Sequence, residues 1–79
     1  MKKDYDERKR IGELLRAARL KAGMSQYDVS NITGFARANV ANVELGKYGA
    51  TLDVLSIIAR AVGCHVSIEP GPPPAFGKD

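Results

Sequence analysis

Apolar side chains recur at helical spacing in four separate stretches of the chain. The first stretch predicts a helix over residues 6–22 that stops at Gly23. Two short helices are predicted over residues 26–32 and 37–45, and a fourth helix follows Thr51 and ends at Gly63. The apolar positions expected to face the core are Ile11, Leu14, Leu15, Ala18 and Ala22, then Val29 and Ile32, then Val40 and Val43, and finally Leu52, Leu55, Ile58, Ala59 and Val62. This pattern predicts a compact all-α domain of four to five helices over residues 1–63.

The polar residues between the helices support these boundaries, with one exception. Ser25 is placed to cap the second helix together with Asp28, and Thr51 is placed to cap the fourth. Gly46 is suited to end the third helix. Ala36 precedes that helix but has no side-chain oxygen, so its start is expected to lack about 1 kcal/mol of capping.

The pattern changes period after the fourth helix. Residues 64–69 read CHVSIE, in which Cys64, Val66 and Ile68 alternate with polar residues as in a half-buried β-strand. A lone strand has unpaired backbone groups, so we expect it to pair with the same strand of a second copy in a two-fold dimer. The alternative is an extended segment that lies over the helices. Residues 70–79 hold four prolines in five positions and predict a flexible, Pro-rich tail.

Composition restricts the class of protein. A chain of 79 residues has room for one small domain, and its single cysteine, expected to be a small buried residue, fits a reducing cytoplasm. A membrane span requires about 18 consecutive apolar residues, and no apolar stretch of the sequence approaches this length. The net charge is +3, and the first 22 residues hold eight basic and four acidic side chains. This excess indicates either a solvated helix face or a surface that meets a polyanion.

Two short helices joined by a turn with a central glycine describe a helix-turn-helix unit over about residues 25–46. Its close crossing requires a small residue in the first helix and apolar anchors on the second, and Ser30, Gly34, Val40 and Val43 supply them. With Ser25-Gln26 at the start and Glu44-Leu45-Gly46 at the end, this run resembles the lambda-repressor-like, or Cro/C1-type, helix-turn-helix family. The resemblance covers roughly residues 7–63.

The resemblance implies that residues 37–45 form a recognition helix that lies in the major groove of double-stranded DNA. It places five residues at base-contacting positions, namely Arg37, Ala38, Asn39, Ala41 and Asn42. It places Gln26, Ala36 and Lys47 at phosphate-contacting positions, to which Arg16 or Arg19 could add, and it implies an internal role for Glu44. Arginine and asparagine can form paired hydrogen bonds with guanine and adenine, respectively.

The expected function is a dimeric, sequence-specific transcriptional regulator, a repressor above all, acting on a pseudo-palindromic operator. The resemblance leaves open a stand-alone repressor or the antitoxin of a toxin-antitoxin pair, which would also bind a toxin protein. The alternative is a protein-interaction module that reuses the fold without binding DNA. His65 has no ligand-like neighbours in the sequence, and no acid-base or nucleophile pattern is visible. We therefore expect no metal, no cofactor and no enzymatic activity.

Overall fold

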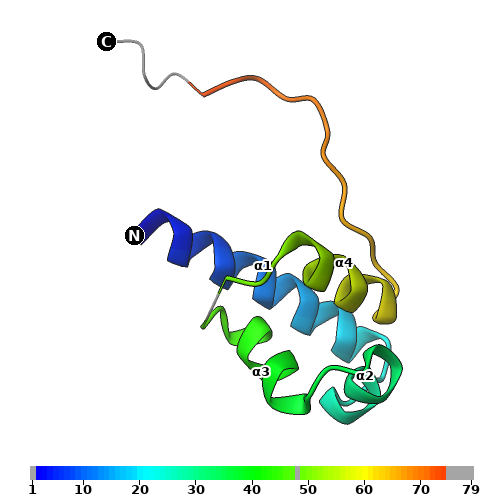
Figure 1. Ribbon diagram of the computed structural model, residues 1–79. Helices are drawn as coiled ribbons and strands as arrows, with labels where there is room; N and C mark the ends of the chain where they lie inside the picture. The colour runs from blue at the N-terminus through cyan, green and yellow to red at the C-terminus, as the bar shows by residue number, and fades with distance from the viewer. Residues whose placement is uncertain (1, 48, 75–79) are drawn as a thin grey trace.

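The computed structural model describes residues 2–47 and 49–74, and within them it contains four helices (Figure 1). The helices are α1 (Lys2–Lys21), α2 (Gln26–Thr33), α3 (Arg37–Leu45) and α4 (Leu52–Ala61). The predicted bounds of α3 agree with those observed, whereas α1 begins four residues before the predicted start. The all-α prediction is confirmed for the described part of the chain.

The helices enclose one small core. Helix α1 packs against α3, and α2 packs against both α3 and α4 (Figure 1). Val29 and Val40 are fully buried where α2 and α3 meet. The buried apolar residues are Leu15, Val29, Val40, Val43, Ile58, Ala59 and Val62. Each of these positions was predicted to face the core.

The helix ends follow the predicted capping. The Ser25 hydroxyl accepts from the Asp28 amide at 3.0 Å, and the Asp28 carboxylate accepts from the Ser25 amide at 2.8 Å, which completes a capping box. The Thr51 hydroxyl accepts from the Val54 amide at 3.2 Å. Ala36 makes no side-chain cap for α3, as its methyl group requires.

Four residues predicted to face the core lie at the surface instead: Leu14, Ala22, Ile32 and Leu52. On α2 the inward position after Val29 belongs to Thr33, whose hydroxyl donates to the Val29 carbonyl at 2.8 Å. Ile32 is therefore 62% exposed. On α1 the inward face runs through Gly12, Leu15 and Arg19, and this rotation leaves Leu14 59% exposed.

The predicted strand at residues 64–69 is not formed within the described chain. These residues continue as an extended segment without a backbone ladder (Figure 1). A strand requires hydrogen bonds to a neighbouring strand, and residues 2–47 and 49–74 supply none there. Val66 and Ile68 instead line a shallow groove with Leu52 and Ser56 of α4. The segment is extended, as in the alternative, but residues 64–69 are all exposed, with Ile68 93% exposed, so beyond this groove it does not cover the helices.

Candidate nucleic-acid interface

A tight turn sets the angle between α2 and α3. Gly34 ends α2 in the left-handed conformation, with φ of 81°, and its amide donates to the Ser30 carbonyl at 2.8 Å. The Ser30 hydroxyl donates to the Phe35 carbonyl at 2.6 Å, across the turn. Ser30 therefore has two roles. Its small size allows the helices to cross closely, and its hydroxyl supplies a hydrogen bond to the Phe35 carbonyl, which lies in the turn.

The C-terminal end of α3 lies directly against α1. A Cβ atom placed on Gly12 of α1 would be 2.4 Å from the Glu44 carbonyl oxygen, and one on Gly46 would be 2.8 Å from the Lys9 Cα atom. Backbone therefore meets backbone at two points of this crossing. The sequence analysis did not identify Gly12, although a glycine inside a helix often marks such an approach.

A buried ion pair lies beside this crossing. The Arg19 guanidinium donates to both carboxylate oxygens of Glu44, with Nε–Oε2 of 2.6 Å and Nη2–Oε1 of 3.1 Å, and Nη1 donates to the Met24 carbonyl at 2.8 Å. Hydrogen bonding to Glu44 raises the pKa of Arg19 above its ordinary value. The internal role expected for Glu44 is confirmed.

Arg19 itself was expected among the phosphate-contacting residues, and the structure places it elsewhere. Its side chain is buried, with the whole residue 7% exposed. All three guanidinium nitrogens are engaged with Glu44 and Met24. Arg19 therefore joins α1 to α3 and does not present its charge to a ligand, whereas Arg16, one turn earlier on α1, is exposed.

Gln26 connects the ion pair to the start of α3. Its Nε2 donates to Glu44 Oε1 at 3.0 Å, and its Oε1 accepts from Arg37 Nη1 at 3.3 Å. The carboxylate can only accept and the guanidinium can only donate, so both neighbours favour the same orientation of the amide. A continuous series of hydrogen bonds thus runs from buried Arg19 to exposed Arg37.

The predicted base-contacting residues divide into two groups. Arg37, Ala38 and Asn39 are exposed at the start of α3, whereas Ala41 and Asn42 are half-buried. Ala38 and Asn42 are four residues apart and share one side of the helix, away from buried Val40. The N-terminal end of α3, residues 36–39 and called the head of α3 below, thus presents short side chains beside one long basic side chain, that of Arg37.

The other predicted contact residues border this surface. Ala36 is exposed at the start of α3, Lys47 is exposed just beyond its end, and Gln26 is half-buried between α2 and α3. A basic residue that was not predicted, Arg8, lies beside the loop after Lys47: a Cβ atom on Gly49 would be 3.1 Å from Arg8 Nε. The contact joins segments about forty residues apart, which no local sequence pattern reveals.

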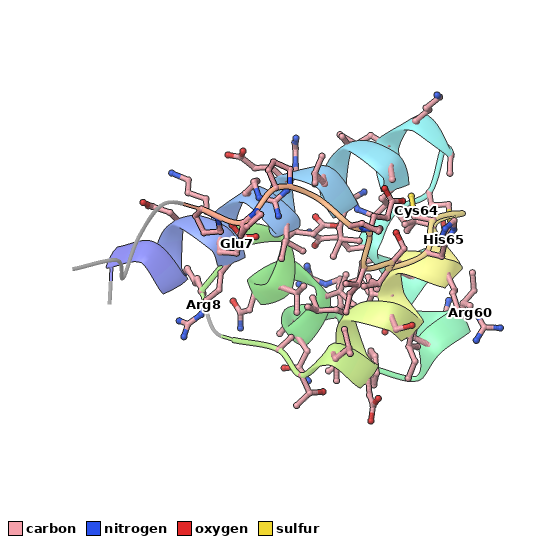
Figure 2. The ribbon with its side chains drawn as sticks, turned by 90° about the horizontal axis from the view of Figure 1, so that it is seen from above. Glu7, Arg8, Arg60, Cys64 and His65 are labelled. Carbon is pink, nitrogen blue, oxygen red and sulfur yellow. The ribbon has the colours of Figure 1, made fainter. Side chains whose placement is uncertain are left out.

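Of the residues predicted for dimerisation, Cys64 lies at the far end of the domain from Arg8 (Figure 2). Cys64, Val66 and Ile68 are all exposed, so the expectation that Cys64 is buried is wrong for the single chain. Its position follows the end of α4, where the Cys64 amide donates to the Ala59 carbonyl at 2.8 Å.

The described residues contain no group of three or more His, Cys, Asp or Glu side chains that could hold a metal ion. None of the described helices combines the length and the apolar character that crossing a membrane requires.

The tight turn between α2 and α3, the packing of α3 against α1 and the exposed N-terminal end of α3 together define a helix-turn-helix protein. A helix-turn-helix family profile matches residues 15–68, about two-thirds of the chain, and the chain belongs to this Cro/C1-type family of DNA-binding transcriptional regulators.

The chain is similar to the competence pilus inhibition repressor of Acinetobacter baylyi. The two are 30% identical over 57 residues, which are 72% of this chain and 52% of the relative. The chain therefore spans about half the length of that relative. No solved structure matches the chain significantly.

Proposed function

We propose that the protein binds specific double-stranded DNA sites as a homodimer and acts as a repressor. One observation supports the proposal above the others: the head of α3 is exposed and carries a single arginine that Gln26 already holds. Short side chains around this arginine allow base edges to approach the helix closely. The similarity to a protein named as a repressor supports repression rather than activation.

Direct readout is assigned to the exposed side of α3. Arg37 bonds guanine O6 and N7, and Asn42, assisted by Asn39, bonds adenine N6 and N7. Ala38 and Ala41 contact the methyl group of thymine without obstructing approach. Because this surface offers few long polar side chains, part of the specificity is assigned to the shape and flexibility of the DNA.

Contacts to the DNA backbone are assigned to the border of the surface. Lys47 and Arg16 contribute positive charge, and Gln26 and the amide groups near Ala36 contribute hydrogen bonds. Arg8 is added because its guanidinium lies beside the loop that follows Lys47. These contacts fix the position of the protein but carry no sequence information.

Dimerisation is assigned to residues 64–69 and the adjoining face of α4. Cys64, Val66 and Ile68 are exposed there, as are Leu52 and Ile57 of the helix. Pairing of two copies would bury these apolar side chains and complete the hydrogen bonds of an antiparallel strand pair. Two copies of α3 would then be about one turn of DNA apart, roughly 34 Å.

The function is tested by selecting bound sites from random duplex DNA with wild-type protein, then comparing two variants. Arg37→Ala should weaken binding by about 1–3 kcal/mol and relax the preference at one base position. Lys47→Ala should weaken binding evenly across sequences and reduce the salt slope by about one unit. No enriched site with the wild type would favour the interaction module, and an unchanged Arg37→Ala variant would contradict the assignment of α3.

The dimer is tested by deleting residues 64–79 and measuring mass by sedimentation. The proposal expects the full chain to be dimeric and the truncated chain monomeric. An unchanged dimer would place the interface elsewhere.

A stand-alone repressor and an antitoxin are distinguished by the product of the neighbouring gene. Co-purification of that product with this protein would support the antitoxin.

A further inference from the structure

Tyr27 is a large aromatic residue that the domain does not use for its core. It is the second residue of α2 and is 64% exposed. Burial therefore does not explain a tyrosine at this position. Its ring instead lies under the guanidinium of Arg37, with Arg37 Cζ 5.1 Å from the ring centroid.

Together Tyr27 and Gln26 restrict Arg37 in two ways. The guanidinium lies over the Tyr27 ring, and this cation–π contact restricts where the group can move. Gln26 Oε1 accepts from Nη1 at 3.3 Å and so limits its rotation. Among the described residues, Nε and Nη2 of Arg37 donate to no other group. These two nitrogens form one edge of the fork, with the spacing that pairs with guanine O6 and N7.

We propose that Tyr27 is a specificity-determining positioning residue: its ring holds the Arg37 guanidinium with the Nε–Nη2 edge directed at a guanine. The inference rests on the proposed DNA-binding function and names a residue that acts through Arg37. An arginine on an exposed helix start otherwise samples many rotamers, and ordering it on binding opposes association. A ring that already restricts the guanidinium reduces that loss, and it does so for the base that matches the held edge.

The proposal predicts different results for two substitutions at one position. Tyr27→Phe keeps the ring and removes the hydroxyl, whereas Tyr27→Leu keeps apolar bulk and removes the aromatic face. An exposed cation–π contact corresponds to about a two- to fivefold effect in affinity. We expect Tyr27→Leu to lose about this factor on the preferred site and to relax the preference at the Arg37 base position alone. Tyr27→Phe should match the wild type.

The experiment measures affinities for the selected site and for its three single-base changes at the Arg37 position, by fluorescence anisotropy at fixed salt. Ile32→Ala is the matched control, since Ile32 is an equally exposed apolar residue of the same helix. It should leave base preference unchanged, and thermal unfolding of all variants should show that each is folded.

Three results would overturn the proposal. Tyr27→Leu could retain wild-type preference, which would leave the ring without a role. It could weaken binding to all four sites equally, which would indicate a general contact. Tyr27→Phe could lose as much as Tyr27→Leu, which would assign the effect to the hydroxyl and to direct contact with DNA.

A measurement without DNA distinguishes failure of this inference from failure of the proposed function. The Arg37 Nε–Hε resonance of the free protein should shift between wild type and Tyr27→Leu, because the ring current is lost, and should move little in Tyr27→Phe. If the wild type binds no DNA, the specificity role falls with the function even where this shift is seen. If DNA is bound but the resonance does not move, the ring does not hold the arginine and only the inference fails.

Discussion

The two ends of α3 are held in different ways. At its C-terminal end the backbone of α3 touches the backbone of α1, and Glu44 is buried in an ion pair with Arg19. At its N-terminal end Ala36 provides no side-chain cap, and residues 36–39 are exposed. One end of the helix is fixed by main chain and buried charge, whereas the side chains at the other end are exposed.

The difference shows how a short helix can be both rigid and accessible. A helix that enters the major groove, the role we propose for α3, cannot be buried along its length, because the groove must reach it. The domain therefore fixes α3 at its C-terminal end. Gln26 connects this end to the other, because its side-chain amide hydrogen-bonds to both Glu44 and Arg37 and so restricts the Arg37 side chain. Arg19 and Arg37 thus stand at opposite ends of one series of hydrogen bonds, one buried and one exposed.

The largest effect is expected where the fixed end loses its ion pair. Glu44→Ala would leave the Arg19 guanidinium buried without its carboxylate, and breaking a buried pair in this way costs about 3–5 kcal/mol. A chain of this length is stable by only roughly 4–12 kcal/mol, so the variant would lose a large share of its stability. Urea unfolding, monitored by circular dichroism, measures the change in the free energy of unfolding.

The exposed pair of Glu7 and Arg10 on α1 is the control for Glu44→Ala. Both side chains are 59% exposed, and the Arg10 guanidinium lowers the pKa of Glu7. Arg10→Ala should leave the urea midpoint nearly unchanged, since solvent screens such pairs. An equal loss in the two variants would show that burial does not distinguish the Arg19–Glu44 pair, and the comparison of the two ends would fail.

Gly12→Ala tests the backbone contact at the same end. Alanine favours a helix by about 0.8–1.0 kcal/mol over glycine, so the substitution would stabilise an isolated α1. In the folded protein its Cβ would lie 2.4 Å from the Glu44 carbonyl oxygen. Moving the helices apart is expected to outweigh the propensity and to destabilise the protein by about 1–3 kcal/mol.

Gly71→Ala serves as the control for Gly12→Ala, because no atom lies within 4 Å of a Cβ placed on Gly71. Its urea midpoint should match that of the wild type. A stabilised Gly12→Ala variant would mean that α1 and α3 can separate without loss, which contradicts a fixed C-terminal end.

Local rules predicted the parts of the structure that depend on neighbouring residues. The bounds of α3 followed from its apolar spacing and from Gly46, and its missing cap followed from Ala36 alone. Val40 and Val43 were predicted as its anchors, and both are buried. These features require only helical periodicity and the chemistry of helix ends.

The features that could not be predicted from the sequence depend on contacts between distant segments of the chain. Arg19 and Glu44 are 25 residues apart, and nothing near Arg19 distinguishes it from exposed Arg16. Leu14 and Ile32 were assigned to the core because they continue the helical spacing of apolar residues in their segments. The packing of α1 on α3 and the hydroxyl of Thr33 decided otherwise. Tyr27 gave no signal, since its partner Arg37 lies on another helix.

The smallest of the expected stability effects concerns the exposed end of α3, where Ala36→Ser would supply the missing cap. Ala36 already has extended backbone, with φ of −62° and ψ of 144°, so a serine hydroxyl could accept from the Ala38 or Asn39 amide without rearrangement. We expect a gain of about 1 kcal/mol in the free energy of unfolding. Thr51→Ala, which removes an existing cap from α4, is the matched control and should lose a similar amount. If Ala36→Ser brings the gain and leaves DNA affinity unchanged or higher, the uncapped end is not required for recognition. If it is stabilising but weakens binding, the space beside the alanine methyl admits the DNA backbone, and the absence of a side-chain cap at this end serves DNA binding.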